Sequence, residues 1–461
     1  MCKSNVNIRA LKLLHSFSPT LFPLMIVRQF FYQLSPYFSI YMAAEIVSEL
    51  FGSRDVDRLI ILVAITISAN FLIEILKSTL NRAFNHSRDI LQQREDLHFH
   101  KKTLSLDYHD LENPEIRQLR RKIIDNERSF GHGKESLFWD IDNLVSEAIN
   151  ICFAIYLFSE MLFVILRDGV NAAVIIFILG MILLLVINIA YIFFYKRKLA
   201  NLGNAITDDM IDTNRVDDAI DSYNMGKDVR IYRQDKIIMW IKEVFLENLD
   251  KNVGIKYQNA QFAYGILRSF LENLLQILTY LFVCVYALQG LFEIGSVIKY
   301  VSFMQRLIGA VMSISSSIGS LKYNTPFIED YMSFFYIPQK MYQGTLSVEK
   351  RDDNEYTVEF INVSFKYPGT DSYALKNLNL KFNIGQRIAV VGMNGSGKTT
   401  MIKLLCRLYD PTEGEIKLNG FDIKKYDYDE YMELFSVVFQ DFKLFSFTLG
   451  QNVATSVDYD G

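Results

Sequence analysis

The feature that most constrains this chain is a run of residues, Val170–Tyr195, that contains no Asp, Glu, Lys or Arg. A helix of about 20 apolar residues is long enough to cross the roughly 30 Å hydrocarbon core of a bilayer. Helices in the core of a soluble protein rarely stay free of charge over such a length. The run therefore predicts a membrane-spanning helix, and a lipid bilayer as a partner.

Five further segments are apolar enough to predict spanning helices, although several of them carry isolated polar residues. These segments are Phe17–Ala44, Leu59–Leu76, Ala148–Leu166, Asn273–Phe292 and Ile294–Leu321. Together with the first run they predict an all-α, six-helix transmembrane domain over residues 17–325. A cytoplasmic segment of residues 1–16 is expected to precede it.

Two long polar loops, at about residues 81–141 and 196–260, alternate with very short connections. Both loops are dense in Lys and Arg, so the positive-inside rule places the loops and both chain ends in the cytoplasm. Few Gly or Pro residues interrupt them, so we expect the spanning helices to continue as long cytoplasmic helical extensions. The expected location is the plasma membrane, with multiple passes.

Each long loop contains one predicted break. In the first loop, Asn113 is a good helix N-cap, and Pro114 is tolerated at the first position of a helix. This pair predicts a turn and a new short helix at the tip of the loop. In the second loop, Gly226 marks a comparable break.

Six polar residues lie inside the predicted spans, where exposure to lipid is costly. One interpretation is a polar substrate path in the interior of the helix bundle. The other is that the residues form interhelical hydrogen bonds or reach the membrane interface. The sequence leaves both interpretations open for Arg28, Glu74, Glu160, Gln276, Gln305 and Arg306.

Charge and cysteine spacing argue against two other classes of protein. The formal net charge is −4, whereas a nucleic-acid-binding domain is expected to be basic, so no nucleic acid partner is predicted. The four cysteines show no CxxC spacing, which argues against a zinc site or a redox motif.

The composition changes near residue 345, which predicts a linker over residues 326–348 and a second domain over residues 349–461. Three β-like runs follow, at Thr357–Phe365, Leu375–Phe382 and Ile388–Val391. The last run leads directly into a segment that fits G-x-x-x-x-G-K-[ST], the phosphate-binding P-loop. We therefore expect a partial α/β P-loop ATPase domain after the helical domain.

The residue types in this loop suit a nucleoside triphosphate. Glycines let the backbone turn its N–H groups toward phosphate oxygens. Lys398 supplies positive charge for the β- and γ-phosphates, and the Thr399 hydroxyl is placed to ligate Mg²⁺. The N-terminus of the helix that follows adds a favourable dipole for anions. The predicted loop comprises Gly392, Met393, Asn394, Gly395, Ser396, Gly397, Lys398, Thr399 and Thr400.

Six spans ahead of a P-loop domain, with two long helical cytoplasmic loops, resemble an ABC transporter of the exporter type. Residues 365–368 (FKYP) are similar to the A-loop of that family, which implies that Tyr367 lies under the adenine ring of ATP. Residues 437–441 (VVFQD) are similar to the Q-loop. That likeness implies that Gln440 approaches Mg²⁺ and the attacking water.

The same resemblance implies partners and a function. The loop tips near Asp107–Glu115 and Ser222–Tyr232 are similar to the coupling helices that dock on the nucleotide-binding domain. The chain would then be a subunit of an ATP-driven exporter that binds ATP and Mg²⁺. It would work with a second ABC transporter subunit, as a homodimer or heterodimer. Its solute is unknown. A peptide, a lipid or an amphipathic compound could each be exported by alternating access.

One departure from the family limits this expectation. The LSGGQ signature, the Walker B aspartate, the catalytic glutamate and the switch histidine of the family lie downstream of the Q-loop, and none occurs before Gly461. No catalytic set is complete, so hydrolysis by these residues alone is not expected. A C-terminal truncation, a split gene and a degenerate product each account for this departure. The alternative function is a nucleotide-binding membrane subunit that does not transport and is regulatory or channel-like.

Overall fold

The structure is a computed structural model. It describes residues 4–168, 172–221, 223–248, 254–339, 341–348, 356–440 and 442–454. The chain divides into two compact units. The helical unit comprises Met1–Lys102 and Gln118–Tyr336, and the C-terminal unit comprises Thr103–Arg117 and Ile337–Gly461. Residues 170, 171, 222 and 349–355 of the predicted elements lie outside the described residues.

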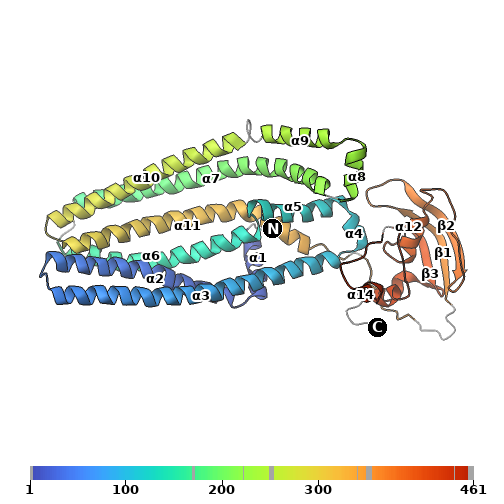
Figure 1. The fold of residues 1–461 in the computed structure, drawn as a ribbon, viewed down its shortest axis with the longest axis horizontal. Coiled ribbons are helices and arrows are strands. Elements are labelled where there is room, and N and C mark those ends of the chain that lie inside the picture. Colours follow the sequence, from blue (N-terminus) through green and yellow to red (C-terminus); the bar gives the residue numbers. More distant parts are fainter. Residues whose placement is uncertain are drawn as a thin grey trace. The chain divides into compact units, whose positions relative to one another are not determined.

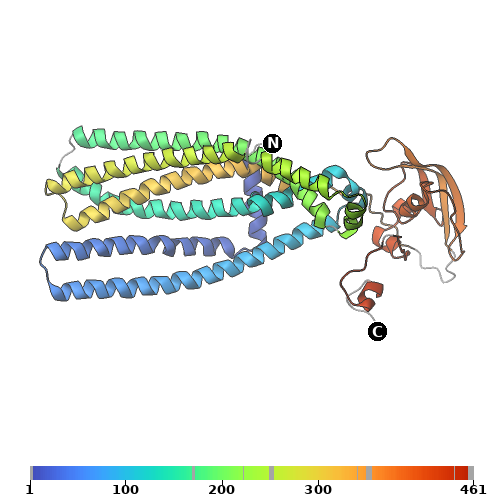
Figure 2. The ribbon, with the colours of Figure 1, turned by 45° about the horizontal axis from the view of Figure 1, so that its top comes forward.

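Long helices make up the helical unit and run side by side in both ribbon views (Figures 1 and 2). Among them, α3 and α7 continue without interruption from an apolar stretch into the polar loop that follows, as their length predicts. The described helices are α1 (Ser4–Phe17), α2 (Leu21–Phe51), α3 (Val56–Leu104), α5 (Pro114–Phe130), α6 (Lys134–Asp168), α7 (Ala172–Asp221), α8 (Tyr223–Ile231), α9 (Asp235–Asn248), α10 (Gly254–Leu288) and α11 (Ile294–Phe335).

Five helices of the described residues are long and apolar enough to cross a membrane, and a sixth span is formed if α1 and α2 are counted together. The prediction that the first span begins at Phe17 is wrong, because Phe17 ends α1 and α2 begins at Leu21. Pro19 lies in the break, where a missing N–H and a fixed φ favour a turn. The two helices are bent by 97° at this point.

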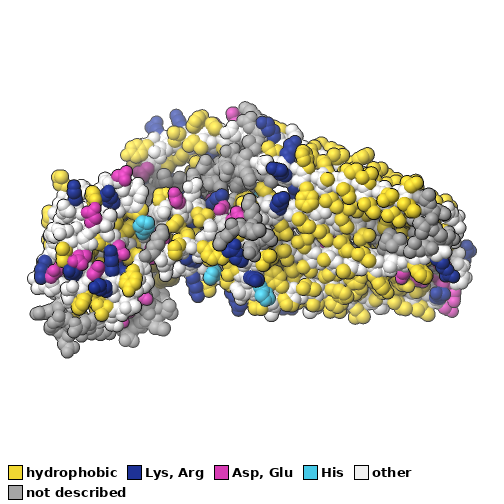
Figure 3. Space-filling model, turned by 180° about the vertical axis from the view of Figure 1, so that it is seen from behind, with side chains coloured by type: hydrophobic (Ala, Val, Ile, Leu, Met, Phe, Trp, Pro, Cys, Tyr) yellow, Lys and Arg dark blue, Asp and Glu magenta, His cyan; other side chains and the backbone are white. Residues whose placement is uncertain are grey.

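The outer surface of the helical unit is apolar, as expected for contact with lipid. Large side chains such as Phe71 on α3 and Ile176 on α7 are 66% and 70% exposed. Figure 3 shows a continuous hydrophobic surface over these helices, with Lys and Arg side chains gathered at its edge. Soluble monomers rarely expose apolar surface on this scale, so the chain is a multi-pass membrane protein with an all-α membrane domain.

Inside the helical unit, polar side chains from α2 and α6 form a ladder that we call the polar seam. The Arg28 guanidinium donates to the Asp142 carboxylate at 2.6 and 2.8 Å. One turn further along, Gln33 donates to Ser146 at 2.7 Å, and the next turn adds a hydrogen bond from Tyr37 to Asn150 Oδ1 at 2.6 Å. The spacing of about one turn on each helix keeps all the pairs on one interface. The seam is defined as Arg28, Gln29, Gln33, Tyr37, Asp142, Ser146 and Asn150.

The first long loop has the predicted turn at its tip. The Asn113 side chain accepts from the Glu115 N–H at 2.9 Å, and α5 begins at Pro114. A short helix, α4 (Tyr108–Glu112), precedes this turn. In the second loop the break is not at Gly226, which lies inside α8. The chain turns instead near Arg233, whose φ is +49°.

The C-terminal unit is built on an antiparallel sheet with strand order β2-β1-β3-β4. Its strands are β1 (Thr357–Lys366), β2 (Tyr373–Asn383), β3 (Glu413–Leu418) and β4 (Phe421–Asp422). Phe360 pairs with Leu380 on β2 and with Ile416 on β3. Inward-facing residues of these strands pack against Leu404 of α12 (Lys398–Leu405) to form the core. The predicted strands at 357–365 and 375–382 are therefore confirmed.

Two predictions for this unit differ from the structure. The linker predicted over residues 326–348 is helical up to Phe335, because α11 continues that far. The strand predicted at Ile388–Val391 is absent, and Val391 is 92% exposed. A strand needs a ladder partner for its N–H and C=O groups, and no described segment pairs with residues 388–391.

Candidate nucleotide-binding site

The P-loop joins residue 392 to the N-terminus of α12, and its geometry requires glycine. Gly397 is the N-cap of α12, with a φ of +86°. A Cβ at this position would lie 2.5 Å from Leu375 Cδ2 and 2.7 Å from the Ala374 carbonyl oxygen. Only glycine satisfies both the left-handed backbone and this close approach. Gly395 also has a positive φ, of +82°.

Lys398 begins α12 and turns back over the loop. Its Nζ donates to the carbonyl oxygens of Gly392 and Met393, both at 2.8 Å. The ammonium group is thereby held beside the N–H groups that open the helix. An anionic group there would meet a positive charge, a helix N-terminus and a backbone without side chains at the glycines.

These residues fit the phosphate groups of ATP. The Gly392–Ser396 segment is exposed, and the Thr399 side chain at the start of α12 is exposed beside it. Mg²⁺ prefers oxygen ligands and usually combines one or two protein groups with phosphate oxygens and water. The Thr399 hydroxyl would be the one protein group in such a set of Mg²⁺ ligands. Among the described residues, no group of three His, Cys, Asp or Glu could hold a metal ion.

Tyr367 lies next to the P-loop helix. Its hydroxyl is 3.0 Å from the hydroxyl of Thr400, which is buried in the first turn of α12. Its half-buried ring meets Tyr409 edge-on, with the centroids 5.6 Å apart. The structure thus brings Tyr367 to the predicted loop, while the stacking of adenine on its ring stays a prediction.

Gln440 is not joined to this group. It lies in a turn after an extended segment and is exposed. None of the contacts in the described part of the chain joins Gln440 to the P-loop, and Asp441 is outside that part. Its role at Mg²⁺ therefore also stays a prediction.

The sequence did not single out Lys403 and Tyr409, which connect α12 to the loop tip within the C-terminal unit. Glu112 of α4 accepts a hydrogen bond from the Lys403 ammonium at 3.2 Å and another from the Tyr409 hydroxyl. The Tyr108 ring lies edge-on to Tyr409, with the centroids 5.4 Å apart. A signal was present, because Lys403 follows Lys398 by five residues on the same short helix.

The electrostatics of this contact follow from partial burial and from the Glu112 carboxylate. Burial alone would lower the pKa of Lys403, but the hydrogen bond and charge of Glu112 raise it overall. Burial and Glu112 together raise the pKa of Tyr409 far above its ordinary value. Burial alone would raise the pKa of Glu112, but hydrogen bonds from Tyr409, Tyr108 and Lys403 lower it overall. The ion pair Glu112–Lys403 is therefore the charged form at neutral pH.

Three of the six polar residues predicted inside the spans are paired between helices. The seam holds Arg28, and the Lys299 ammonium of α11 lies 3.0 Å from Glu160 of α6. Arg306 donates to Gln33 at 3.5 Å. For these residues the structure favours interhelical pairing over an open substrate path. Glu74 pairs with Lys77 on its own helix.

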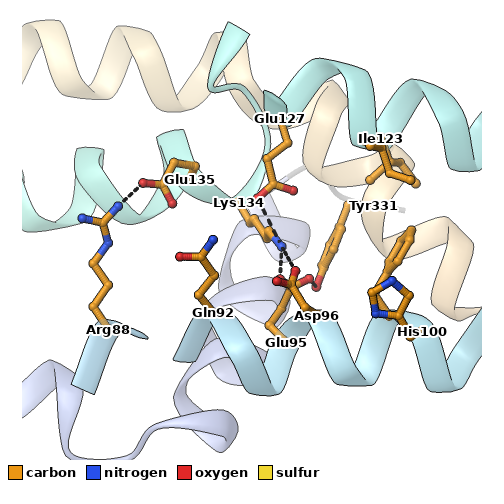
Figure 4. Close-up of a pocket in the computed structure, with 12 residues that line it drawn as sticks. Arg88, Gln92, Glu95, Asp96, His100, Ile123, Glu127, Lys134, Glu135 and Tyr331 are labelled. Atoms are coloured by element: carbon orange, nitrogen blue, oxygen red, sulfur yellow. Dashed lines mark hydrogen bonds and ion pairs between the residues drawn. The ribbon is translucent and has the colours of Figure 1, made fainter. Parts of the chain in front are cut away.

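A cavity of about 430 Å³ in the helical unit has a second polar cluster in its wall (Figure 4). Lys134 points toward three carboxylates and is within 3.2 Å of Glu127 and 3.6 Å of Asp96. It also pairs with Glu95, which accepts a hydrogen bond from Tyr331 at 2.7 Å. Since these groups come from α3, α5, α6 and α11 and contact the one Lys134 ammonium or its partner Glu95, the cluster ties four helices together.

Comparisons with known proteins agree with this geometry. Residues 375–459 match the ABC transporter family. The chain is 36% identical over 169 residues to the subtilin transport ATP-binding protein SpaT of Bacillus subtilis, covering 36% of this chain and 27% of SpaT. It is 29% identical over 193 residues to the nisin transport ATP-binding protein NisT of Lactococcus lactis, covering 42% of this chain and 32% of NisT.

A third relative is the ATP-dependent lipid A-core flippase of Escherichia coli K12, which is 44% identical over 97 residues, or 21% of this chain and 17% of the flippase. The matches thus span a third or less of the length of these relatives. A solved structure of a bacterial Atm1-family ABC exporter with ATP bound is similar over 96% of this chain and 75% of its own. Its TM-score is 0.70 and the sequence identity is 16%.

The likeness to the solved exporter shows the fold of the whole chain, and the sequence matches identify the domain that carries the P-loop. Both agree with apolar spanning helices followed by a glycine-rich phosphate loop at the start of a helix. Residues 375–459 therefore match the ABC transporter family, and the chain as a whole has the fold of a solved ABC exporter, in which apolar spanning helices precede the domain that carries the P-loop.

Proposed function

We propose that this chain is a subunit of an ATP-driven exporter that moves a solute out of the cytoplasm by alternating access. The observation that carries the proposal is the P-loop, whose glycines and Lys398 fit a phosphate group in a chain with an exporter-type fold. The solute class, which includes peptides, lipids and amphipathic compounds, is open. The proposed location is the plasma membrane, with both termini in the cytoplasm.

The proposed nucleotide site consists of residues 392–400 for the phosphates, Thr399 and Gln440 for Mg²⁺, and Tyr367 for the adenine ring. When bound, Mg²⁺ would neutralise charge on the phosphate oxygens. Lys398 would exchange its two carbonyl partners for phosphate oxygens. Thr400 would keep Tyr367 in place through the 3.0 Å hydroxyl contact.

The contact between α4 and α12 supports the proposal that the first loop senses nucleotide. Because Lys403 shares a helix of eight residues with Lys398, a shift of α12 on binding phosphate would move the partner of Glu112. We propose that the second loop tip docks on the ATP-binding domain of a second subunit, in a homodimer or heterodimer. Exposed apolar side chains at this tip support the proposal: Ile231 is 71% exposed and Tyr232 is 70% exposed.

We further propose that strands supplied by the rest of an ATPase domain cover an apolar surface beside the P-loop. Apolar residues that follow the P-loop sheet are exposed, including Val391 at 92% and Val438 at 81%. Burying such side chains stabilises a domain by about 1.5–3 kcal/mol each, so a further set of strands over this surface is physically favourable.

Nucleotide binding to the 461-residue chain in lipid nanodiscs tests the proposal. Fluorescent ATP should bind the parent chain, and Lys398→Ala should weaken binding about tenfold or more, because a hydrogen-bonded charge contributes about 1.5–3 kcal/mol. Lys425→Ala is the control, since Lys425 is an exposed lysine of the same domain. Equal binding by the two variants would contradict the assignment.

The alternative function, a regulatory or channel-like subunit, is distinguished by turnover. The chain should be supplied with the downstream part of an ATPase domain and assayed for ATP hydrolysis with candidate solutes. Hydrolysis that a solute stimulates supports export. Binding of ATP without any hydrolysis supports the alternative.

A further inference from the structure

A second cavity of the helical unit, of about 630 Å³, has a strongly basic wall. Its cations are Lys196 and Arg197 of α7 and Lys322 of α11. The rest of its lining is Phe193, Phe194, Gly319 and Tyr323. We call these seven residues the basic pocket.

In the part of the chain that the structure describes, the three cations of the basic pocket form no ion pair. Two charged groups that act on Lys196 are Asp140 of α6 and Arg268 of α10. Glu272 is held by Arg268 at 2.7 Å. Asp140 accepts a hydrogen bond from Ser136 at 3.3 Å and attracts Lys196 without forming an ion pair.

Packing keeps the pocket open between the two helices. Gly319 has no side chain, and the aliphatic stem of Lys196 lies over it. A Cβ at Gly319 would be 3.6 Å from Lys196 Cδ. A lysine stem packed on an apolar surface holds its ammonium group at the rim.

The location of the pocket relates it to the bilayer. Phe193 and Phe194 end the apolar stretch of α7 and are 38% and 69% exposed, and two of the cations, Lys196 and Arg197, follow within four residues. Aromatic and basic side chains at the end of a spanning helix lie at the level of lipid head groups. Figure 3 shows that basic side chains gather at the edge of the hydrophobic surface on the face in view.

We propose that the basic pocket binds the phosphate head group of an anionic phospholipid from the adjoining leaflet. The acyl chains would lie along Phe193 and Phe194, while Lys196, Arg197 and Lys322 would contact the phosphate. Basic pockets between spanning helices on the cytoplasmic side suit such head groups. A lipid explains both the aromatic side chains and the cations, whereas a free phosphate ion would use only the cations.

Native mass spectrometry of the 461-residue chain tests the proposal. The protein is reconstituted with equal parts of phosphatidylglycerol and phosphatidylcholine, released into mild detergent, and its retained lipids are counted. We expect the parent chain to retain phosphatidylglycerol selectively. The triple variant Lys196→Gln, Arg197→Gln, Lys322→Gln should retain it about 100-fold less well, because each cation near an anionic lipid contributes about 1 kcal/mol.

Matched variants separate the pocket from general surface charge. Lys198→Gln removes a neighbouring cation that does not line the cavity, and it should retain lipid like the parent chain. Gly319→Leu keeps all three charges and fills the space, so it should lose retention. Inorganic phosphate at millimolar concentration should not displace the lipid.

Three outcomes would overturn the proposal. They are equal retention by the triple variant and Lys198→Gln, equal retention of the two lipids by the parent chain, and displacement by inorganic phosphate. Binding of fluorescent ATP should be unchanged in every variant, which shows that the C-terminal unit is folded, and a melting temperature in detergent close to that of the parent chain shows the same for the helical unit. The lipid proposal can thus fail while the proposed export function stands, and the reverse also holds.

Discussion

The polar seam and the basic pocket belong to the same helical unit, but they treat charge in opposite ways. In the seam, the buried Arg28 side chain has a carboxylate partner at 2.6 Å. In the pocket, Lys322 and its two cationic neighbours line an open cavity and have no ion pair in the described structure. A buried charge is costly without a partner, whereas a charge at the head-group level is solvated. The comparison indicates a structural role for the first set and a ligand-binding role for the second.

The largest expected effect is at the seam. Asp142→Ala leaves the Arg28 guanidinium buried without its partner and should destabilise the helical unit by about 3–5 kcal/mol. Thermal unfolding of the purified protein in detergent measures this loss. The double variant Arg28→Met, Asp142→Leu is the control and should return to near the parent melting temperature. A melting temperature for Asp142→Ala equal to that of the parent chain would show that the pair is not buried.

A smaller effect is expected about two turns further along the seam. Tyr37→Phe removes only the hydroxyl that donates to Asn150 and should cost about 1 kcal/mol, the net value of a typical hydrogen bond. The same unfolding experiment measures it. Tyr32→Phe is the matched control, because Tyr32 is 39% exposed and should show no change. Equal losses in the two variants would argue against the ladder.

A paired but partly exposed charge provides an intermediate case. The pKa of Glu112 is lowered in the folded protein. Its charged form therefore stabilises the contact between α4 and α12 at pH values above 4.5, the ordinary pKa of a glutamate, and this stability is lost as the pH falls below 4.5. Glu112→Gln should remove this dependence at a cost of under about 1 kcal/mol. Hydrogen exchange of residues 103–117 at pH 7 and near pH 4 measures it. An unchanged pH dependence in the variant would exclude Glu112 as the titrating group.

The smallest effect on stability is expected in the basic pocket. Neutralising Lys196, Arg197 and Lys322 should change the free energy of unfolding by less than about 0.5 kcal/mol, because no partner is left unpaired. The melting temperature in detergent measures this change. A loss of stability as large as that expected for Asp142→Ala would contradict the comparison between the seam and the pocket. Such a loss would show that the pocket cations hold the helices together.

Local patterns in the sequence predicted much of the fold. The apolar runs near 59–76, 148–166 and 273–292 lie largely in α3, α6 and α10, and the turn at Asn113–Pro114 is present. These features depend on residues close together in the chain. The glycine and lysine positions of the P-loop were also predictable, since Gly397 must adopt a positive φ where it stands.

Both non-local pairing and local backbone preferences explain the failures. The strand predicted at 388–391 needs ladder partners that no described segment supplies, and the α1–α2 break depends on Pro19 rather than on mean hydropathy. Gly226 was expected to interrupt a helix, yet α8 runs through it. Glycine in a helix costs only about 1 kcal/mol relative to alanine, which neighbouring residues can outweigh.

By itself, the sequence determined that apolar helices cross a bilayer and that a phosphate loop follows them, because length, charge and glycine spacing act locally. Tertiary structure alone decided which polar residues find partners. Arg28 and Asp142 are 114 positions apart, and Glu112 and Lys403 are 291 apart. Such pairs depend on which helix faces meet, and no pattern within one segment specifies that. The same packing left Lys196, Arg197 and Lys322 beside an open cavity, where a charge can bind a ligand.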